Sequence, residues 1–287
     1  MIRNTLKTAV LLAGLGGILI VGGGLLFGQV GVLLGALAGF AFVGVSYWKS
    51  DVIAIKAARA VPVTEQEMPQ LYAVVRELTE KAGMPMPKLY VSQEMQPNAF
   101  ATGRDPEHAA VAVTQGILRV LDWDELRAVL AHEISHVGNR DILIGSVAAA
   151  LAMMITFVAR IAMWGAIFGG GRGDDRDNNN AIGMVAFAIL GPMAAGLLQM
   201  ALSRSREYEA DRSGARLIGT GEPLARALEK LDRAARVTPM DIDPAHATAY
   251  IVNPLTGKQM QFKNLFTTHP PTEERVRRLR GGDWHHH

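Results

Sequence analysis

The feature that most constrains the fold of this chain is a set of four long apolar stretches. They cover about residues 8–27, 30–48, 142–168 and 181–202. Each is near or above the roughly 20 residues that an α-helix needs to cross the hydrocarbon core of a bilayer. The chain as a whole has 49% hydrophobic residues and a mean hydropathy of +0.16. The sequence therefore predicts a mainly α-helical membrane protein with four transmembrane helices.

Three of these stretches have alternative interpretations. Arg3 and Lys7 precede the first stretch, as in a signal peptide, but no polar cleavage region follows and the second stretch begins at once. We therefore expect residues 1–50 to form a retained transmembrane hairpin. The segment 142–202 is expected to form a second hairpin. It could alternatively supply core helices of a soluble domain, since Arg160 interrupts its first apolar run.

The distribution of basic residues predicts the membrane topology. Lys and Arg flank the outer ends of the first hairpin, whereas the connection 28–30 carries none. Because cytoplasmic flanks are enriched in Lys and Arg, both chain termini are expected in the cytoplasm. The segments 51–141 and 203–284 then lie on the cytoplasmic side and together are large enough for one folded domain. Residues 285–287 are three histidines and resemble a tag remnant.

Composition excludes several kinds of site. The chain has no cysteine, so thiolate metal sites, disulfides and cysteine nucleophiles are excluded. Its formal net charge of +2 gives no reason to expect a nucleic acid partner. Any metal ion must therefore be held by His, Asp or Glu.

Residues 132–136 read His-Glu-Ile-Ser-His and carry the clearest chemical signal. On a helix, positions i and i+4 lie on one face, so His132 and His136 can reach one zinc ion. Glu133 would then lie beside a metal-bound water. Apolar residues at Leu126 and Leu130 predict a stripe with the two histidines on its flank, half covered and half open.

A third ligand is expected from the segment that follows the fourth apolar stretch. If the helix continues through residues 203–211, Glu207 and Asp211 share one face at i, i+4. Glu207 could then bind the metal, and Asp211 could accept a hydrogen bond from the outer nitrogen of a ligand histidine. The alternative interpretation is a charged surface shared with neighbouring arginines.

The region before the zinc motif predicts a helix start and two strands. Asp122 and Glu125 have the spacing of a capping box. The run 98–103 could form an exposed edge strand beside 111–113, with Thr114 capping a following helix. An extended peptide substrate could pair with that edge through Asn98, Ala99, Phe100 and Ala101. The alternative is a strand with no role in substrate binding.

Several motifs together resemble one known family. H-E-I-S-H is followed by Asn139 and Asp141, then by S-R-S-R-E-Y-E-A-D at 203–211 and by T-H-P-P at 268–271. The segments 97–103 and 111–116 also match. These motifs resemble the HtpX family of bacterial membrane zinc metalloproteases, which is related to the CAAX prenyl proteases. The resemblance covers nearly the whole chain.

The resemblance implies a fold, a cofactor and roles for individual residues. It implies a gluzincin-like α+β domain with a small sheet and one Zn²⁺ per chain, held by His132, His136 and Glu207. It makes Glu133 the general base, places Asn139 near the ligands and makes His269 a candidate donor to the oxyanion. A histidine that merely orders a loop beside two prolines is the alternative for His269.

The resemblance also implies a biological setting. Substrates would be misfolded or damaged membrane proteins and other polypeptides, the enzyme could cleave itself, and it would lie in a bacterial inner membrane with its active site in the cytoplasm. Two other functions remain open: processing of prenylated peptides, and a membrane scaffold or holdase clamped by structural zinc.

The run 273–280, including Arg275, is expected to form a solvated or membrane-facing helix.

Overall fold

The computed structural model describes residues 28–39, 48–139, 204–237 and 270–285, with single positions 17, 20, 24, 41, 44 and 45. Residues 28–39 and 204–218 are helical. The remaining elements, in chain order, are α2 (Ser50–Ala57), β1 (Ala60–Pro62), α3 (Pro69–Ala82), β2 (Lys88–Ser92), β3 (Ala99–Thr102), η1 (Pro106–His108), β4 (Ala110–Thr114), α4 (Gln115–Val120), α5 (Trp123–Gly138), α8 (Glu222–Val237), α10 (Thr272–Arg280) and η4 (Asp283–His285). The fold is mostly helical with a small mixed sheet, as expected.

The sheet has four strands in the order β1-β2-β4-β3. β2 and β4 are parallel, whereas β1 and β3 pair antiparallel with them at the two edges. The predicted strands at 98–103 and 111–113 are therefore confirmed as β3 and β4. The prediction that β3 lies at an edge is also confirmed for the part of the chain that the structure describes.

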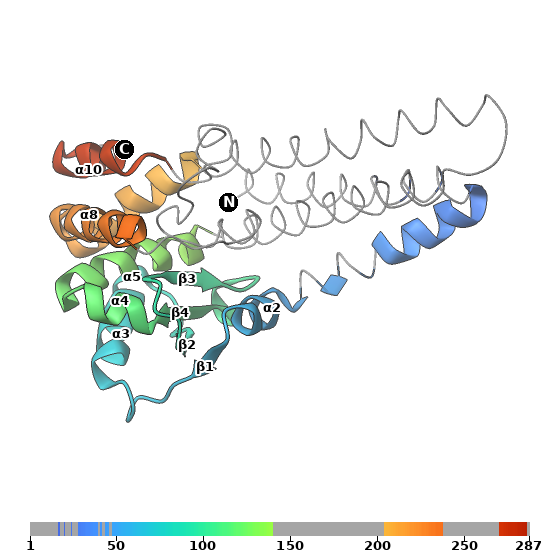
Figure 1. Cartoon of the computed structure of the whole chain (residues 1–287), viewed down its shortest axis with the longest axis horizontal. Coiled ribbons are helices and arrows are strands. Elements are labelled where there is room, and N and C mark those ends of the chain that lie inside the picture. The colour runs from blue at the N-terminus through green and yellow to red at the C-terminus, as the bar shows by residue number, and fades with distance from the viewer. Residues whose placement is uncertain are drawn as a thin grey trace.

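Both faces of this sheet are covered, and β4 shows this in its sequence. Its five residues are all buried. Val111 and Val113 contribute to the main core with α3 and α5, whereas Ala110 and Ala112 pack against Ile55 of α2 on the other face. Because side chains alternate across a strand, the small alanines allow α2 to lie close to the sheet. Figure 1 shows α2 beside the sheet, opposite α5.

The helix that carries the zinc motif begins where the sequence predicts. Asp122 accepts a hydrogen bond from the Glu125 backbone N–H, and the Glu125 side chain accepts one from the Asp122 N–H. This capping box satisfies two amides that would otherwise lack partners at the helix start. Thr114 similarly caps α4 by accepting from the Ile117 N–H. Both predicted caps are confirmed.

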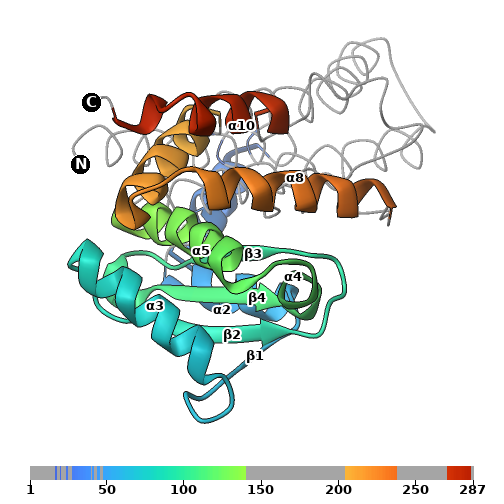
Figure 2. The ribbon, with the colours of Figure 1, turned by 90° about the vertical axis from the view of Figure 1, so that its left-hand side faces the viewer.

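Helices from the second half of the chain stack on α5. Figure 2 shows α8 between α5 and α10, with the segment 204–218 linking these layers. Lys230 of α8 lies 2.6 Å from the buried Glu125 carboxylate at the start of α5. Arg280 of α10 binds Glu222 and Glu229 of α8. Elements far apart in the sequence therefore form one packed unit around α5.

Most of the predicted membrane segments lie outside the described residues. This applies to the stretches 142–168 and 181–202 and to nearly all of 8–27. Within the ranges that are described, no helix combines the length and the apolar character needed to cross a bilayer. Residues 28–39, which include the first part of the second stretch, are helical and carry exposed apolar side chains, including Leu33, Leu34 and Leu37. The four transmembrane helices and the division of the chain at 50, 141 and 202 stay predictions.

Candidate metal centre

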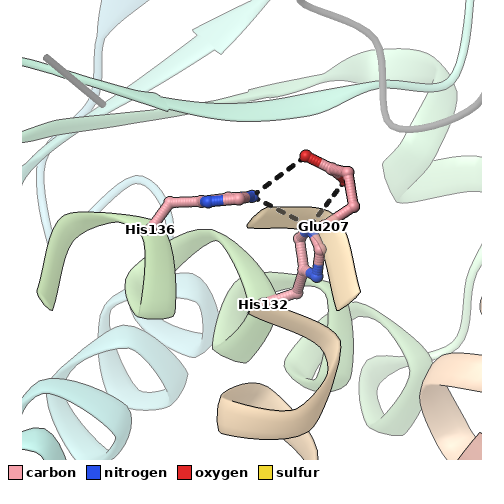
Figure 3. Close-up of side chains that lie close together, drawn as sticks. All are labelled: His132, His136 and Glu207. Atoms are coloured by element: carbon pink, nitrogen blue, oxygen red, sulfur yellow. Dashed lines mark hydrogen bonds and ion pairs between the residues drawn. The ribbon is translucent and has the colours of Figure 1, made fainter. Parts of the chain in front are cut away.

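His132 and His136 lie one turn apart on α5 and turn their rings toward the same point (Figure 3). Their Nε2 atoms are 3.2 Å apart. The predicted half-open position is correct for His136, which is partly buried, but wrong for His132, which is 2% exposed. His132 is covered because the segment 204–218 packs directly on its side of α5.

Glu207 brings a carboxylate to the two imidazoles from that segment. Its Oε2 lies 3.5 Å from His132 Nε2, and its Oε1 lies 3.5 Å from His136 Nε2. One ligand atom from each residue lies within 4.8 Å of the others. Two ligands about 2.05 Å from a tetrahedral zinc ion are themselves about 3.3 Å apart. The observed separations therefore fit a single zinc ion held by two nitrogens and one oxygen.

Asp211 stands behind His132, one turn after Glu207. Its Oδ1 lies 2.9 Å from His132 Nδ1, the ring nitrogen that points away from the metal site. Burial alone would lower the pKa of His132, but contacts with Asp211 and Glu207 outweigh it and raise this pKa to about 10. The two carboxylates around His132 therefore favour a positive charge at this site, as a divalent cation would supply.

Arg275 completes this cluster, and its position corrects the expectation from the sequence. Its side chain is 1% exposed, not solvated or directed at a membrane. Two guanidinium nitrogens lie 2.8 and 2.7 Å from the two carboxylate oxygens of Asp211, and Nη1 lies 3.8 Å from Glu207 Oε2. Burial alone would raise the pKa of Asp211, but the guanidinium holds it at about 2. Asp211 therefore stays ionised opposite His132.

The sequence does contain a weak signal for the burial of Arg275. It lies four residues before Leu279 and next to Val276, and these three form the buried face of α10. Because positions i and i+4 share a helix face, an arginine in register with apolar residues is a candidate for burial. The expectation of a solvated or membrane-facing helix is therefore wrong at Arg275, which has the register of the apolar residues.

Gly214 allows the segment 204–218 to come this close to α5. A Cβ atom at this position would lie 2.9 Å from the backbone nitrogen of His132 and 3.0 Å from its Cα. Gly214 lies one turn beyond Asp211 and two turns beyond Glu207, so all three share a face. The absence of a side chain thus sets the distance between the carboxylate-bearing helix and the histidine-bearing helix. Nothing in the sequence analysis identified this residue.

Glu133, which lies between the two histidines in the sequence, is 6% exposed, and its side chain points toward β3. Its Oε2 accepts a hydrogen bond of 3.0 Å from the backbone N–H of Ala101. A buried carboxylate needs such a donor, because an ionised group removed from water without hydrogen bonds is strongly disfavoured. The zinc motif and the edge strand are therefore joined through Glu133.

Of the four predicted substrate-binding residues, Asn98 directly precedes β3 and the other three lie in it, with unequal exposure. Asn98 and Ala99 are buried, and Phe100 packs toward Ile55 on the far face of the sheet. Asn98 accepts from the Thr114 backbone N–H, and its own N–H donates to Thr114 Oγ1. Contacts available to a substrate are thus mainly those of the strand backbone.

The structure says less about two further predicted residues, Asn139 and His269. Asn139 is the C-cap residue of α5, where its backbone N–H donates to the Ser135 carbonyl. This places it one turn beyond His136, and its role near the ligands stays a prediction. His269, the predicted oxyanion donor, lies outside the described residues.

Comparison with known proteins gives a consistent result. The model of peptidase family M48 matches residues 65–282. A protein named Protease HtpX homolog from Pelotomaculum thermopropionicum is 50% identical over 277 residues, covering 96% of this chain and 98% of the relative. Proteins of the same name from Syntrophobacter fumaroxidans and Thermococcus kodakarensis are also 50% identical over 277 residues, covering 98% and 94% of those relatives.

A solved structure shares the fold. The crystal structure of S. mikatae Ste24p matches with a TM-score of 0.52 at 19% sequence identity. The match covers 97% of this chain but 65% of the Ste24p chain, so this chain spans about two thirds of that protein.

Proposed function

The chain belongs to peptidase family M48 and is a zinc metalloendopeptidase of the HtpX type, and we propose that His132, His136 and Glu207 are its zinc ligands and Glu133 its general base. The observation that carries this assignment is the meeting of three ligand atoms from two separate helices within 4.8 Å. Glu133, next to one ligand in the sequence, faces the edge strand where a peptide could bind. An open ligand position beside a base is typical of catalytic rather than structural zinc sites.

The proposed chemistry divides between the metal and the side chains. Zinc held here would lower the pKa of a bound water from about 15.7 to about 7 and polarise the peptide carbonyl. Glu133 accepts the proton of the attacking water and returns it to the leaving nitrogen. Asp211 fixes the orientation of the His132 ring through Nδ1, and Arg275 keeps Asp211 ionised. His269 is retained as the proposed donor to the oxyanion, which is worth about a hundredfold or more in rate.

The proposed substrate is an extended polypeptide that pairs with the outer edge of β3. An edge strand offers backbone donors and acceptors at fixed intervals and so binds peptides with little dependence on their sequence. This suits an enzyme that removes misfolded or damaged membrane proteins. It also permits self-cleavage where a segment of a second copy reaches the site.

We place the enzyme in a bacterial inner membrane, with both termini and the active site in the cytoplasm. Exposed apolar side chains along 28–39 support contact with lipid. Lys49 and Lys56 follow that helix, as cytoplasmic flanks do. Labelling of cysteines introduced at these two lysines in sealed inverted and right-side-out vesicles tests the topology. Modification from the external side would contradict it.

The central test compares zinc content and hydrolysis of an unfolded protein in detergent. We expect Glu133→Gln to keep one zinc per chain and lose hydrolysis, because only the proton acceptor is removed. His132→Ala and Glu207→Ala should lose zinc as well. Full hydrolytic activity in Glu133→Gln would show that another group is the base. Zinc retained in both proteins, with no hydrolysis by either, would instead support a zinc-clamped scaffold. Cleavage restricted to prenylated C-terminal peptides, with none of an unmodified membrane protein, would instead favour prenyl-peptide processing.

A further inference from the structure

The register of β3 shows which of its backbone groups face outward. Thr114 N–H donates to the Asn98 carbonyl, so the pair 98/114 is hydrogen-bonded across the β3–β4 ladder. In an antiparallel ladder the bonded pairs recur every second residue, and Phe100 pairs with Ala112 and Thr102 with Ala110. The N–H and C=O groups of Ala99 and Ala101 therefore point away from β4. Among the described strands, none pairs with this outer side.

One of these outward groups already has a partner inside the protein. The Ala101 N–H donates to Glu133 Oε2 at 3.0 Å, as the register requires of an outward amide. The bond links a buried carboxylate to a strand that is itself fixed by β4 on its inner side. Rotation about the three side-chain bonds of Glu133 is thereby restricted, while its second oxygen is left to accept a proton.

We propose that the Ala101 amide is a positioning group that fixes the orientation of the Glu133 carboxylate. A bound peptide would then form no hydrogen bond with this amide, which stays bonded to Glu133. The peptide would pair with both backbone groups of Ala99 and with the Ala101 carbonyl alone. The same strand then holds the substrate and the base, so the distance between the base and the peptide bond depends on one rigid element. This inference rests on the proposed role of Glu133.

Proline substitution tests the role of this amide separately from that of the other backbone groups of the strand. Ala101→Pro removes only an outward N–H, which is where edge strands tolerate proline. We expect kcat for a peptide substrate to fall by up to about a hundredfold, as for a misplacement of about 1 Å. KM should stay close to that of the unaltered protein, because the substrate does not use this amide. The midpoint of thermal unfolding should fall less than in a variant that breaks the β3–β4 ladder, because only the hydrogen bond to Glu133 is lost.

Phe100→Pro is the matched reference for structural damage, because it removes the neighbouring inward N–H of the ladder. We expect it to lower the unfolding midpoint and to alter both kcat and KM. An unchanged kcat in Ala101→Pro would overturn the proposal. A loss of thermal stability in Ala101→Pro equal to that of Phe100→Pro would also overturn it, since the Ala101 amide would then belong to the ladder.

Hydrogen exchange tests the bond without relying on activity. In the full-length, zinc-loaded protein the Ala101 amide should exchange slowly despite its outward direction, and at least about tenfold faster in Glu133→Ala. Equal exchange in the two proteins would overturn the proposal. Full activity of Glu133→Gln is a different result, because it removes Glu133 as the base and thus contradicts the proposed function itself.

Discussion

Arg275 and Asp211, 64 residues apart in the sequence, form a buried bidentate ion pair in which Nε lies 2.8 Å from Oδ2 and Nη2 lies 2.7 Å from Oδ1. Asp211 in turn lies 2.9 Å from His132 Nδ1. The C-terminal helix α10 is therefore connected to the zinc motif by one uninterrupted chain of charged groups. This connection makes the orientation of the His132 ring, a proposed zinc ligand, dependent on a residue outside the motifs at 132–136 and 203–211.

Removal of the guanidinium should damage both stability and zinc binding. Arg275→Ala leaves a buried Asp211 charge without its partner, which typically destabilises a protein by about 3–5 kcal/mol. Arg275→Lys should be intermediate, because an ammonium cannot form the bidentate pair. Thermal unfolding in detergent and a chelator competition measure the two effects. Arg277→Ala is the control, since this side chain is 75% exposed and pairs with Glu274 on the same helix.

Loss of the charge on Asp211 should weaken zinc binding. Asp211→Asn replaces the anionic acceptor that favours the metal-binding tautomer of His132 with a neutral amide, so we expect a 10- to 100-fold increase in the zinc dissociation constant. The measurement is titration with a competing chelator. Glu209→Gln on the same helix is the comparison, because Glu209 is 45% exposed and pairs with Arg212. Equal zinc affinity in the two variants would contradict the role of Asp211.

The close approach at Gly214 predicts a large effect from a single methyl group. Gly214→Ala places a carbon 2.9 Å from the His132 backbone nitrogen, so the two helices must separate. We expect a destabilisation of about 1–3 kcal/mol and weaker zinc binding. Gly138→Ala is the matched control, because its Cβ would meet only the flexible Met84 side chain at 3.2 Å. Thermal unfolding and zinc content distinguish the two variants.

Stability at acid pH should depend on Glu77, which joins α3 to α5. Hydrogen bonds from Arg127 and then Lys81 lower the pKa of Glu77 from 4.5 to about 2. A carboxyl whose pKa is lower in the folded state stabilises it above the unfolded pKa and loses that effect as the pH falls. The stabilisation from Glu77 is therefore complete above about pH 4.5 and disappears toward pH 2.

Glu77→Gln should accordingly unfold with less dependence on pH between 4.5 and 2 than the unaltered protein. The side chain is 42% exposed, so solvent screening will keep the effect small. Unfolding midpoints measured with chelator present separate this effect from acid-induced loss of zinc. Glu80→Gln, at an exposed position on the same helix, serves as the control. Parallel pH curves for Glu77→Gln and the unaltered protein would contradict the prediction.

Local patterns were sufficient to predict much of the candidate site. The capping box at Asp122 fixed the start of α5, and the i, i+4 spacing of His132 and His136 placed both rings on one face. The same spacing placed Glu207 and Asp211 together on the segment 204–218. These predictions succeeded because helical periodicity depends only on neighbours within about two turns.

The sequence by itself determined the residues that meet at the site, the helices and edge strand that carry them, and the family to which they belong. The tertiary structure decided what lies behind and beside them: the burial of Arg275, the helix contact at Gly214 and the bond from Ala101 to Glu133. Each of these depends on the distance and rotation between two elements. That geometry comes from packing over the whole core, so local spacing carries at most a weak signal for it, as at Arg275, and cannot fix the distances.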